Sequence, residues 1–168
     1  FLSDEWNFQG GDGVVINDGQ ISAERLFLIG QQVINNGNLI AADGSVVLAS
    51  GDQVLLRNPE GGNVYVEVDG KSVDALKEAA STASASSVAA QELGIKNTGT
   101  VEAGNVLFGV GDDIAQAFTN TGSVVAKYSS GQGGTVQVAA ASGKVTNTGT
   151  IEAKAGAEGA GKVTVHVP

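Results

Sequence analysis

A nine-residue pattern that occurs five times constrains this chain more than any other feature of its sequence. The pattern reads apolar-x-Asn-x-Gly-x-apolar-x-Ala, and no copy departs from it. The copies are VINDGQISA (15–23), VINNGNLIA (33–41), IKNTGTVEA (95–103), FTNTGSVVA (118–126) and VTNTGTIEA (145–153). A short repeated unit cannot bury its apolar face alone, so we expect the copies to stack on one another.

The Asn and Gly of each copy predict a corner in the chain. Asn tolerates left-handed backbone angles and bonds locally, while Gly adopts a positive φ at no steric cost. In stacked copies, equivalent Asn side chains are expected to form a ladder. The members of this predicted turn ladder are Asn17, Gly19, Asn35, Gly37, Asn97, Gly99, Asn120, Gly122, Asn147 and Gly149.

Beyond each corner, apolar and variable residues alternate with a period of two, which indicates a strand with one inward face. The final apolar residue and the Ala of each copy share that face, and the residue between them points outward. These outward residues are Ser22, Ile40, Glu102, Val125 and Glu152. A second strand is predicted after each Ala, at 26–29, 46–49, 106–110, 136–140 and 163–167. The chain is therefore predicted to be an all-β, single-stranded parallel β-solenoid.

Successive Asn positions of the repeat are separated by 18, 62, 23 and 27 residues. The long interval predicts a degenerate extra coil, with strands at 53–57 and 63–68 joined by the turn Asn-Pro-Glu-Gly-Gly at 58–62. We count about six coils, which at ~4.8 Å per stacked strand gives a height on the order of 30 Å. All of them are placed in a single domain, 1–168.

Residues 71–94 are predicted to be a short α-helical insertion within that domain. Ser72 can cap a helix, Val73, Leu76 and Ala80 share one side of it, and Gly94 can end it.

The composition favours a thin core and excludes several classes of function. The chain has 25 glycines and only 5 % aromatic residues, so small aliphatic side chains must fill the interior. A net charge of −9 argues against nucleic acid as a partner. Without Cys there is no disulfide or thiolate site. No apolar stretch is long enough for membrane insertion.

The repeats resemble those of the filamentous haemagglutinin family, large exoproteins exported by two-partner secretion. The resemblance is carried by segments such as GQISAERLFLIGQQVINNGNLIAADGSVVLASGDQVLL and VTNTGTIEAKAGAEGAGKVTVHV, and it covers nearly the whole chain. It implies a right-handed parallel β-helix, the hand that parallel crossovers generally prefer, on the bacterial outer surface or outside the cell. Because the chain begins at Phe1 and contains no Met, we expect a processed product or a piece of a longer protein.

The residues offer little chemistry for catalysis, and no cofactor or metal is expected. Glu102 and Glu152 could form a carboxylate pair on one face, but Val125 occupies the equivalent position between them. Asp112-Asp113 is interpreted as a solvated turn. In Gly10-Gly11-Asp12-Gly13, a weak match to a calcium-binding repeat, Val15 stands where a ligand is needed. His166, the only histidine, is expected on the outer face of a strand.

Phe1, Trp6 and Phe8 crowd the start of the chain, where they either cap the first coil or contact a neighbouring domain or subunit. The leading hypothesis for function is a structural and adhesive segment of a secreted surface or filament protein, not an enzyme. Its expected partners are flanking domains of a longer exoprotein, a host or cell-surface receptor, or further copies of itself stacked end to end. The alternative is a carbohydrate-binding or polysaccharide-degrading β-helix.

Overall fold

The computed structural model describes residues 5–9, 13–51, 53–57, 65–68, 71–72, 94–111 and 116–167. Within these residues the protein is all-β, with parallel sheets and no helix. The all-β prediction is therefore confirmed.

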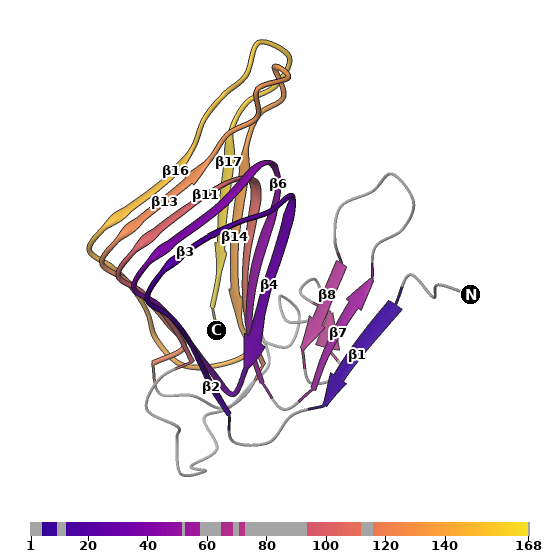
Figure 1. Cartoon of the computed structure of the whole chain (residues 1–168), viewed down its shortest axis with the longest axis vertical. Helices are drawn as coiled ribbons and strands as arrows, with labels where there is room; N and C mark the ends of the chain where they lie inside the picture. Colours follow the sequence, from indigo (N-terminus) through magenta and orange to yellow (C-terminus); the bar gives the residue numbers. More distant parts are fainter. Residues whose placement is uncertain are drawn as a thin grey trace.

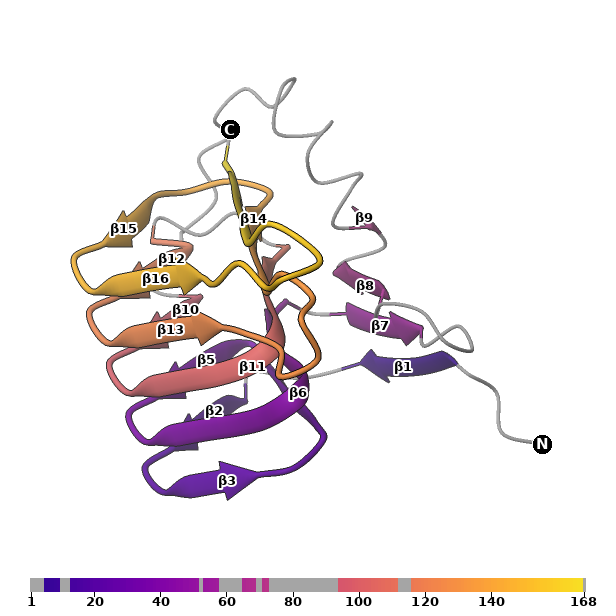
Figure 2. The same cartoon turned by 90° about the horizontal axis from the view of Figure 1, so that it is seen from above.

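The chain passes five times through the same strand positions, and each pass is called a coil here. The coils are residues 14–30, 32–50, 95–110, 118–140 and 145–166. Figure 2 shows them lying one above another, from β3 at one end to β16 at the other.

Each coil contributes strands to three faces of the stack. Coil 1 is β2 (Val14–Asn17), β3 (Gln20–Ser22) and β4 (Arg25–Gly30); coil 2 is β5 (Gln32–Asn35) and β6 (Asn38–Ser50); coil 3 is β10 (Ile95–Asn97) and β11 (Thr100–Val110); coil 4 is β12 (Phe118–Asn120), β13 (Ser123–Ala126) and β14 (Thr135–Ala140); coil 5 is β15 (Val145–Asn147), β16 (Thr150–Ala153) and β17 (Lys162–His166). The long strands β6 and β11 serve the second face with their first half and the third face with their second half.

The five copies of the repeat align in register. On the first face Val15, Val33, Ile95, Phe118 and Val145 are successive partners in parallel strands. The predicted inward positions form the core, which is thin, mainly aliphatic and fully buried in the middle coils. It also contains two aromatic rings, those of Phe108 and Phe118, whose centroids are 4.6 Å apart.

The predicted degenerate coil at 53–68 is wrong, although its strands exist. β7 (Gln53–Arg57) and β8 (Tyr65–Val68) pair antiparallel with each other, and β7 also pairs antiparallel with β1 (Glu5–Gln9). A hairpin reverses the chain, whereas a coil needs parallel strands. The excursion leaves the stack at residue 51 and returns at 94, so coil 2 pairs directly with coil 3. Within the described residues there are thus five coils, about 24 Å of stacked strands.

This antiparallel sheet packs against the outer side of the third face (Figure 1). Val54 and Val68 are buried there against Val47, Ala49 and Ala139. The outer positions of these parallel strands are apolar because a second layer covers them, as is usual for parallel sheets.

Most of the predicted helical insertion, residues 73–93, lies outside the described residues. Its first two residues, Lys71–Ser72, form the short strand β9 and pair antiparallel with β8.

Candidate functional site

The predicted Asn ladder runs through all five coils. Each of the first four Asn side chains donates a hydrogen bond from Nδ2 to Oδ1 of the Asn in the next coil: 2.8 Å from Asn17 to Asn35, 2.8 Å from Asn35 to Asn97, 2.7 Å from Asn97 to Asn120 and 2.8 Å from Asn120 to Asn147. Asn35, Asn97 and Asn120 are fully buried. The ladder therefore gives the interior amide groups partners that water cannot supply.

The glycines of the ladder are required for a different reason from the one predicted. None has a positive φ; the described residues with that conformation are Asp43, Gly131 and Gly143. A Cβ on Gly37 would lie 1.9 Å from the carbonyl oxygen of Gly19, and Gly99, Gly122 and Gly149 meet the preceding coil at 1.9, 2.1 and 2.1 Å. Glycine here allows two backbones to approach closely.

Trp6 and Phe8 lie on β1, where they are 43 % and 42 % exposed. β1 pairs with β7 and not with a strand of coil 1. Phe8 is opposite Val54, so the two aromatic residues share the face that turns toward the stack. Their role as a contact for a neighbouring domain or subunit stays a prediction, and Phe1 lies outside the described residues.

The two outward glutamates occupy the predicted positions on the second face. Val125 separates Glu102 from Glu152 in the register. A carboxylate oxygen of Glu102 is 2.6 Å from Nζ of Lys127, and one of Glu152 is 3.9 Å from Nζ of Lys154. Each carboxylate thus faces a lysine rather than the other carboxylate.

The remaining predicted positions carry no metal-binding arrangement in the described part of the chain. His166 pairs with Ala139, whose side chain belongs to the outer cluster, so its outward orientation is confirmed. Asp112-Asp113 and residues 10–12 lie outside the described residues. No group of three or more His, Cys, Asp or Glu side chains that could hold a metal ion occurs among the residues described.

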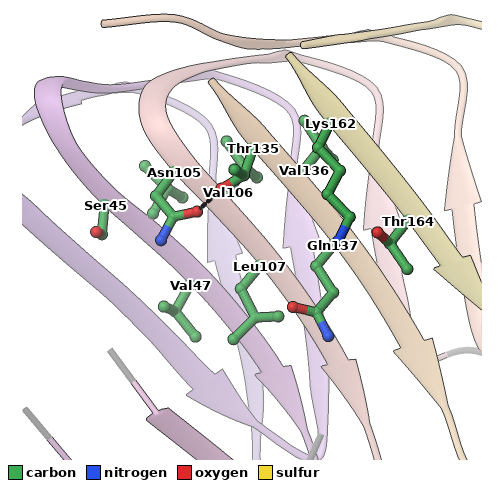
Figure 3. Close-up of a pocket in the computed structure, with 11 residues that line it drawn as sticks. Ser45, Val47, Asn105, Val106, Leu107, Thr135, Val136, Gln137, Lys162 and Thr164 are labelled. Carbon is green, nitrogen blue, oxygen red and sulfur yellow. Dashed lines mark hydrogen bonds between the residues drawn. The ribbon is translucent and has the colours of Figure 1, made fainter. Parts of the chain in front are cut away.

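A groove on the outer side of the third face has a cavity volume of about 270 Å³ (Figure 3). It crosses four strands beside the area that the antiparallel sheet covers, and Val47 and Leu107 belong to both regions. One row across it is Ser45, Asn105, Thr135 and Lys162, and the next is Val47, Leu107, Gln137 and Thr164.

The groove offers hydrogen-bonding groups without an acid or base pair. Thr135 donates to Oδ1 of Asn105, and no carboxylate lines the groove. Lys162 forms no ion pair with a described residue. Such a lining can bind a polar ligand but contains no proton-transfer pair. Sequence reasoning missed the groove because it requires knowing which outward residues the antiparallel sheet leaves uncovered.

A second hollow lies at the corner between the second and third faces. Asp43, with φ 55°, accepts hydrogen bonds from the hydroxyl and the backbone N–H of Ser129 in coil 4, and these bonds lower the pKa of its carboxyl. Coil 3 lies between coils 2 and 4, and at this corner it has Gly104, which is covered by the ring of Tyr128. Burial, and secondarily the charge of Asp43, raise the pKa of the Tyr128 phenol. The cluster joins coils 2 and 4. It could not be predicted from the sequence, in which only the variable length of this corner is visible.

Comparisons with known proteins identify no relative. No family model, no curated protein and no solved structure matches the chain. No helix long and apolar enough to cross a membrane was found in the described residues.

Proposed function

We propose that this chain is a structural and adhesive segment of a secreted bacterial surface protein of the filamentous haemagglutinin type. In this proposal the five coils form a single-stranded right-handed parallel β-helix. The observation that carries it is the parallel stack of five coils, in register along the first face, with its ladder of four Asn–Asn hydrogen bonds.

Such a stack suits a spacer that must keep its shape outside the cell. Each interior strand pairs with two neighbours, so stability accumulates from coil to coil without a thick core. Corners of variable length can present loops to a receptor while the strands stay unchanged. Flanking domains of a longer exoprotein and a host or cell-surface receptor are the partners that this role requires.

A catalytic role is less well supported than binding. Glu102 and Glu152 are separated by Val125 and face lysines, an arrangement unlike the facing carboxyl pair that glycoside hydrolysis uses. The alternative function is carbohydrate binding, which the polar groove of the third face favours. In that case the stack would be the support and the groove would hold the sugar chain.

Adhesion by the purified chain tests the leading proposal. The protein is attached to beads, and bead retention on host-cell monolayers is compared with that of beads carrying the unfolding variant Asn97→Ala at a temperature where only the variant is unfolded. Retention that depends on the folded chain is expected, and equal retention of both would overturn the adhesive role. Turnover of acidic polysaccharides that is lost in a Glu102→Gln, Glu152→Gln double variant would instead establish an enzyme.

A further inference from the structure

The hollow between the second and third faces exists because coil 3 has a very short connection at this corner. Coil 2 places residues 42–44 between the two faces and coil 4 places residues 127–134 there, whereas coil 3 has Gly104 alone. Coil 3 is therefore recessed between the longer loops of its neighbours. The recess is lined by residues 42–43, 102–103 and 127–129, has a cavity volume of about 130 Å³, and is called the corner hollow here.

An aromatic ring forms one wall of the corner hollow. A Cβ on Gly104 would lie 2.3, 2.5 and 2.7 Å from three consecutive ring carbons of Tyr128. Such similar distances mean that the glycine lies against the face of the ring and not against its edge. Tyr128 lines the hollow and Gly104 does not. The surface that the ring presents to the hollow is thus turned away from the glycine, and it is open to a ligand.

Contacts on both sides of Tyr128 hold the ring in place. The next residue, Ser129, donates two hydrogen bonds to the carboxylate of Asp43 in coil 2. The preceding residue, Lys127, donates from its backbone N–H to the carbonyl of Ala103 at 2.7 Å. Its Nζ is 2.6 Å from a carboxylate oxygen of Glu102. A wall that is already ordered loses little entropy when a ligand binds.

The charges around the corner hollow favour a neutral ligand. Both carboxylates already have partners, Ser129 for Asp43 and Lys127 for Glu102. A cation would be repelled by Lys127, and an anion would be repelled by the two carboxylates. Carboxylate acceptors beside an ammonium donor instead suit hydroxyl groups, because a hydroxyl both donates and accepts hydrogen bonds.

The shape and the apolar part of the hollow favour a single ring as the ligand. The apolar surface comes from the ring of Tyr128 and from Ala42, which is exposed. A volume of about 130 Å³ is smaller than the roughly 300–1,000 Å³ of pockets for drug-sized ligands. A proline-rich peptide needs a groove lined by aromatic side chains, and Tyr128 is the only aromatic residue among the described ones that line the hollow. A sugar ring has both an apolar C–H face and a rim of hydroxyls.

We infer that the corner hollow binds one neutral sugar residue of a glycan, with a C–H face against Tyr128 and hydroxyls on Asp43, Glu102 and Lys127. The inference rests on the adhesive role proposed above and names the chemical class of the receptor. The hollow shares no lining residue with the groove of the third face. One ring on one aromatic wall binds weakly, with a Kd on the order of 1 mM.

Saturation-transfer difference NMR on the whole chain tests the class of ligand. The neutral rings are the methyl glycosides of glucose, galactose, mannose and N-acetylglucosamine. The contrasting probes are the tetramethylammonium ion, methyl glucuronide as an anion, and a proline-rich peptide. At least one neutral ring should bind, and more tightly than any contrasting probe. No binding of a neutral ring up to about 20 mM, or tighter binding of a contrasting probe, overturns the inference.

Two kinds of variant test whether the sugar contacts Tyr128. Tyr128→Leu removes the ring and should weaken binding at least about tenfold, whereas Tyr128→Phe keeps the ring and should stay within about threefold of the parent. Gly104→Ala keeps Tyr128 but displaces its ring, so it should weaken binding to a similar extent. Phe8→Leu changes an exposed aromatic residue outside the hollow and is the control, with binding unchanged. Melting temperatures report whether each variant is folded.

The outcomes separate this inference from the functions proposed above. Parent-like binding in both Tyr128→Leu and Gly104→Ala overturns the inference. Loss of binding in Gln137→Ala alone also overturns it, because the sugar then lies in the groove of the third face. A sugar that binds as expected, together with equal bead retention by the folded and unfolded chain, supports the site and removes the adhesive role.

Discussion

Replacing Asn97 with alanine tests whether the buried ladder stabilises the stack. Asn97 is fully buried, accepts a hydrogen bond from Asn35 and donates one to Asn120. Its loss leaves a donor on Asn35 and an acceptor on Asn120 without partners. An unsatisfied buried polar group costs roughly 1–3 kcal/mol, so Asn97→Ala should lower the free energy of unfolding by about 4 kcal/mol.

Asn147→Ala is the matched control, because it makes the same change at the exposed end of the ladder. Only the bond from Asn120 is lost there, 2.8 Å long, and water can replace the missing partner. We expect a loss of about 1 kcal/mol or less.

Urea unfolding followed by far-ultraviolet circular dichroism measures both variants. For a domain of this size, a loss of about 4 kcal/mol lowers the melting temperature by about 8–16 °C. If the free energies of unfolding of Asn97→Ala and Asn147→Ala agree within about 0.5 kcal/mol, the reasoning is refuted, because the interior ladder bonds would then add no stability beyond that of the exposed one.

Three further predictions follow from individual contacts. Gly99→Ala should cost about 3 kcal/mol or more in urea unfolding, because its methyl group would lie 1.9 Å from a carbonyl oxygen of coil 2; a change below about 0.5 kcal/mol would contradict this close approach. Phe118→Ala, which removes a buried ring 4.6 Å from that of Phe108, should cost about 3–5 kcal/mol in the same assay, and a neutral result would mean that the core refills. The folded state disfavours the ionised phenol of Tyr128, whose pKa is raised. The free energy of unfolding should therefore fall as the pH rises from the ordinary tyrosine pKa through the raised one. Ultraviolet titration of the Tyr65→Phe variant should place the pKa of Tyr128 above the ordinary tyrosine value. Adding Asp43→Asn should lower that pKa, and an unchanged pKa would exclude the coupling between Asp43 and Tyr128.

The repeat predicted the stack well because each of its positions makes the same contact in every coil. The apolar residues, the Asn and the outward positions of the second face all align as expected, from Val15 in coil 1 to Glu152 in coil 5. The role of glycine was predicted wrongly. A local turn and a close approach of two backbones both select glycine, and only the folded structure distinguishes them.

The antiparallel sheet was misassigned because a strand carries no signal for the direction of its partner. Gln53–Arg57 was correctly predicted as a strand, yet its partners β1 and β8 lie on either side of it in an antiparallel sheet. The groove and the Asp43–Ser129 link depend on which surface that sheet covers and on loops that meet only after folding. Neither could be found from the spacing of residues.

The excursion between coils 2 and 3 has a consequence for how this chain can vary. Asn35 and Asn97 bond across 62 residues, whereas Asn97 and Asn120 bond across 23. The entropy of closing a loop grows only with the logarithm of its length, so the longer connection costs only about 0.9 kcal/mol more than the shorter one. The strands β7, β8 and β9 are thus inserted between two coils at small thermodynamic cost. The junction after residue 51 and before residue 94 is a place where one module can be exchanged for another while the coils on either side keep their pairing.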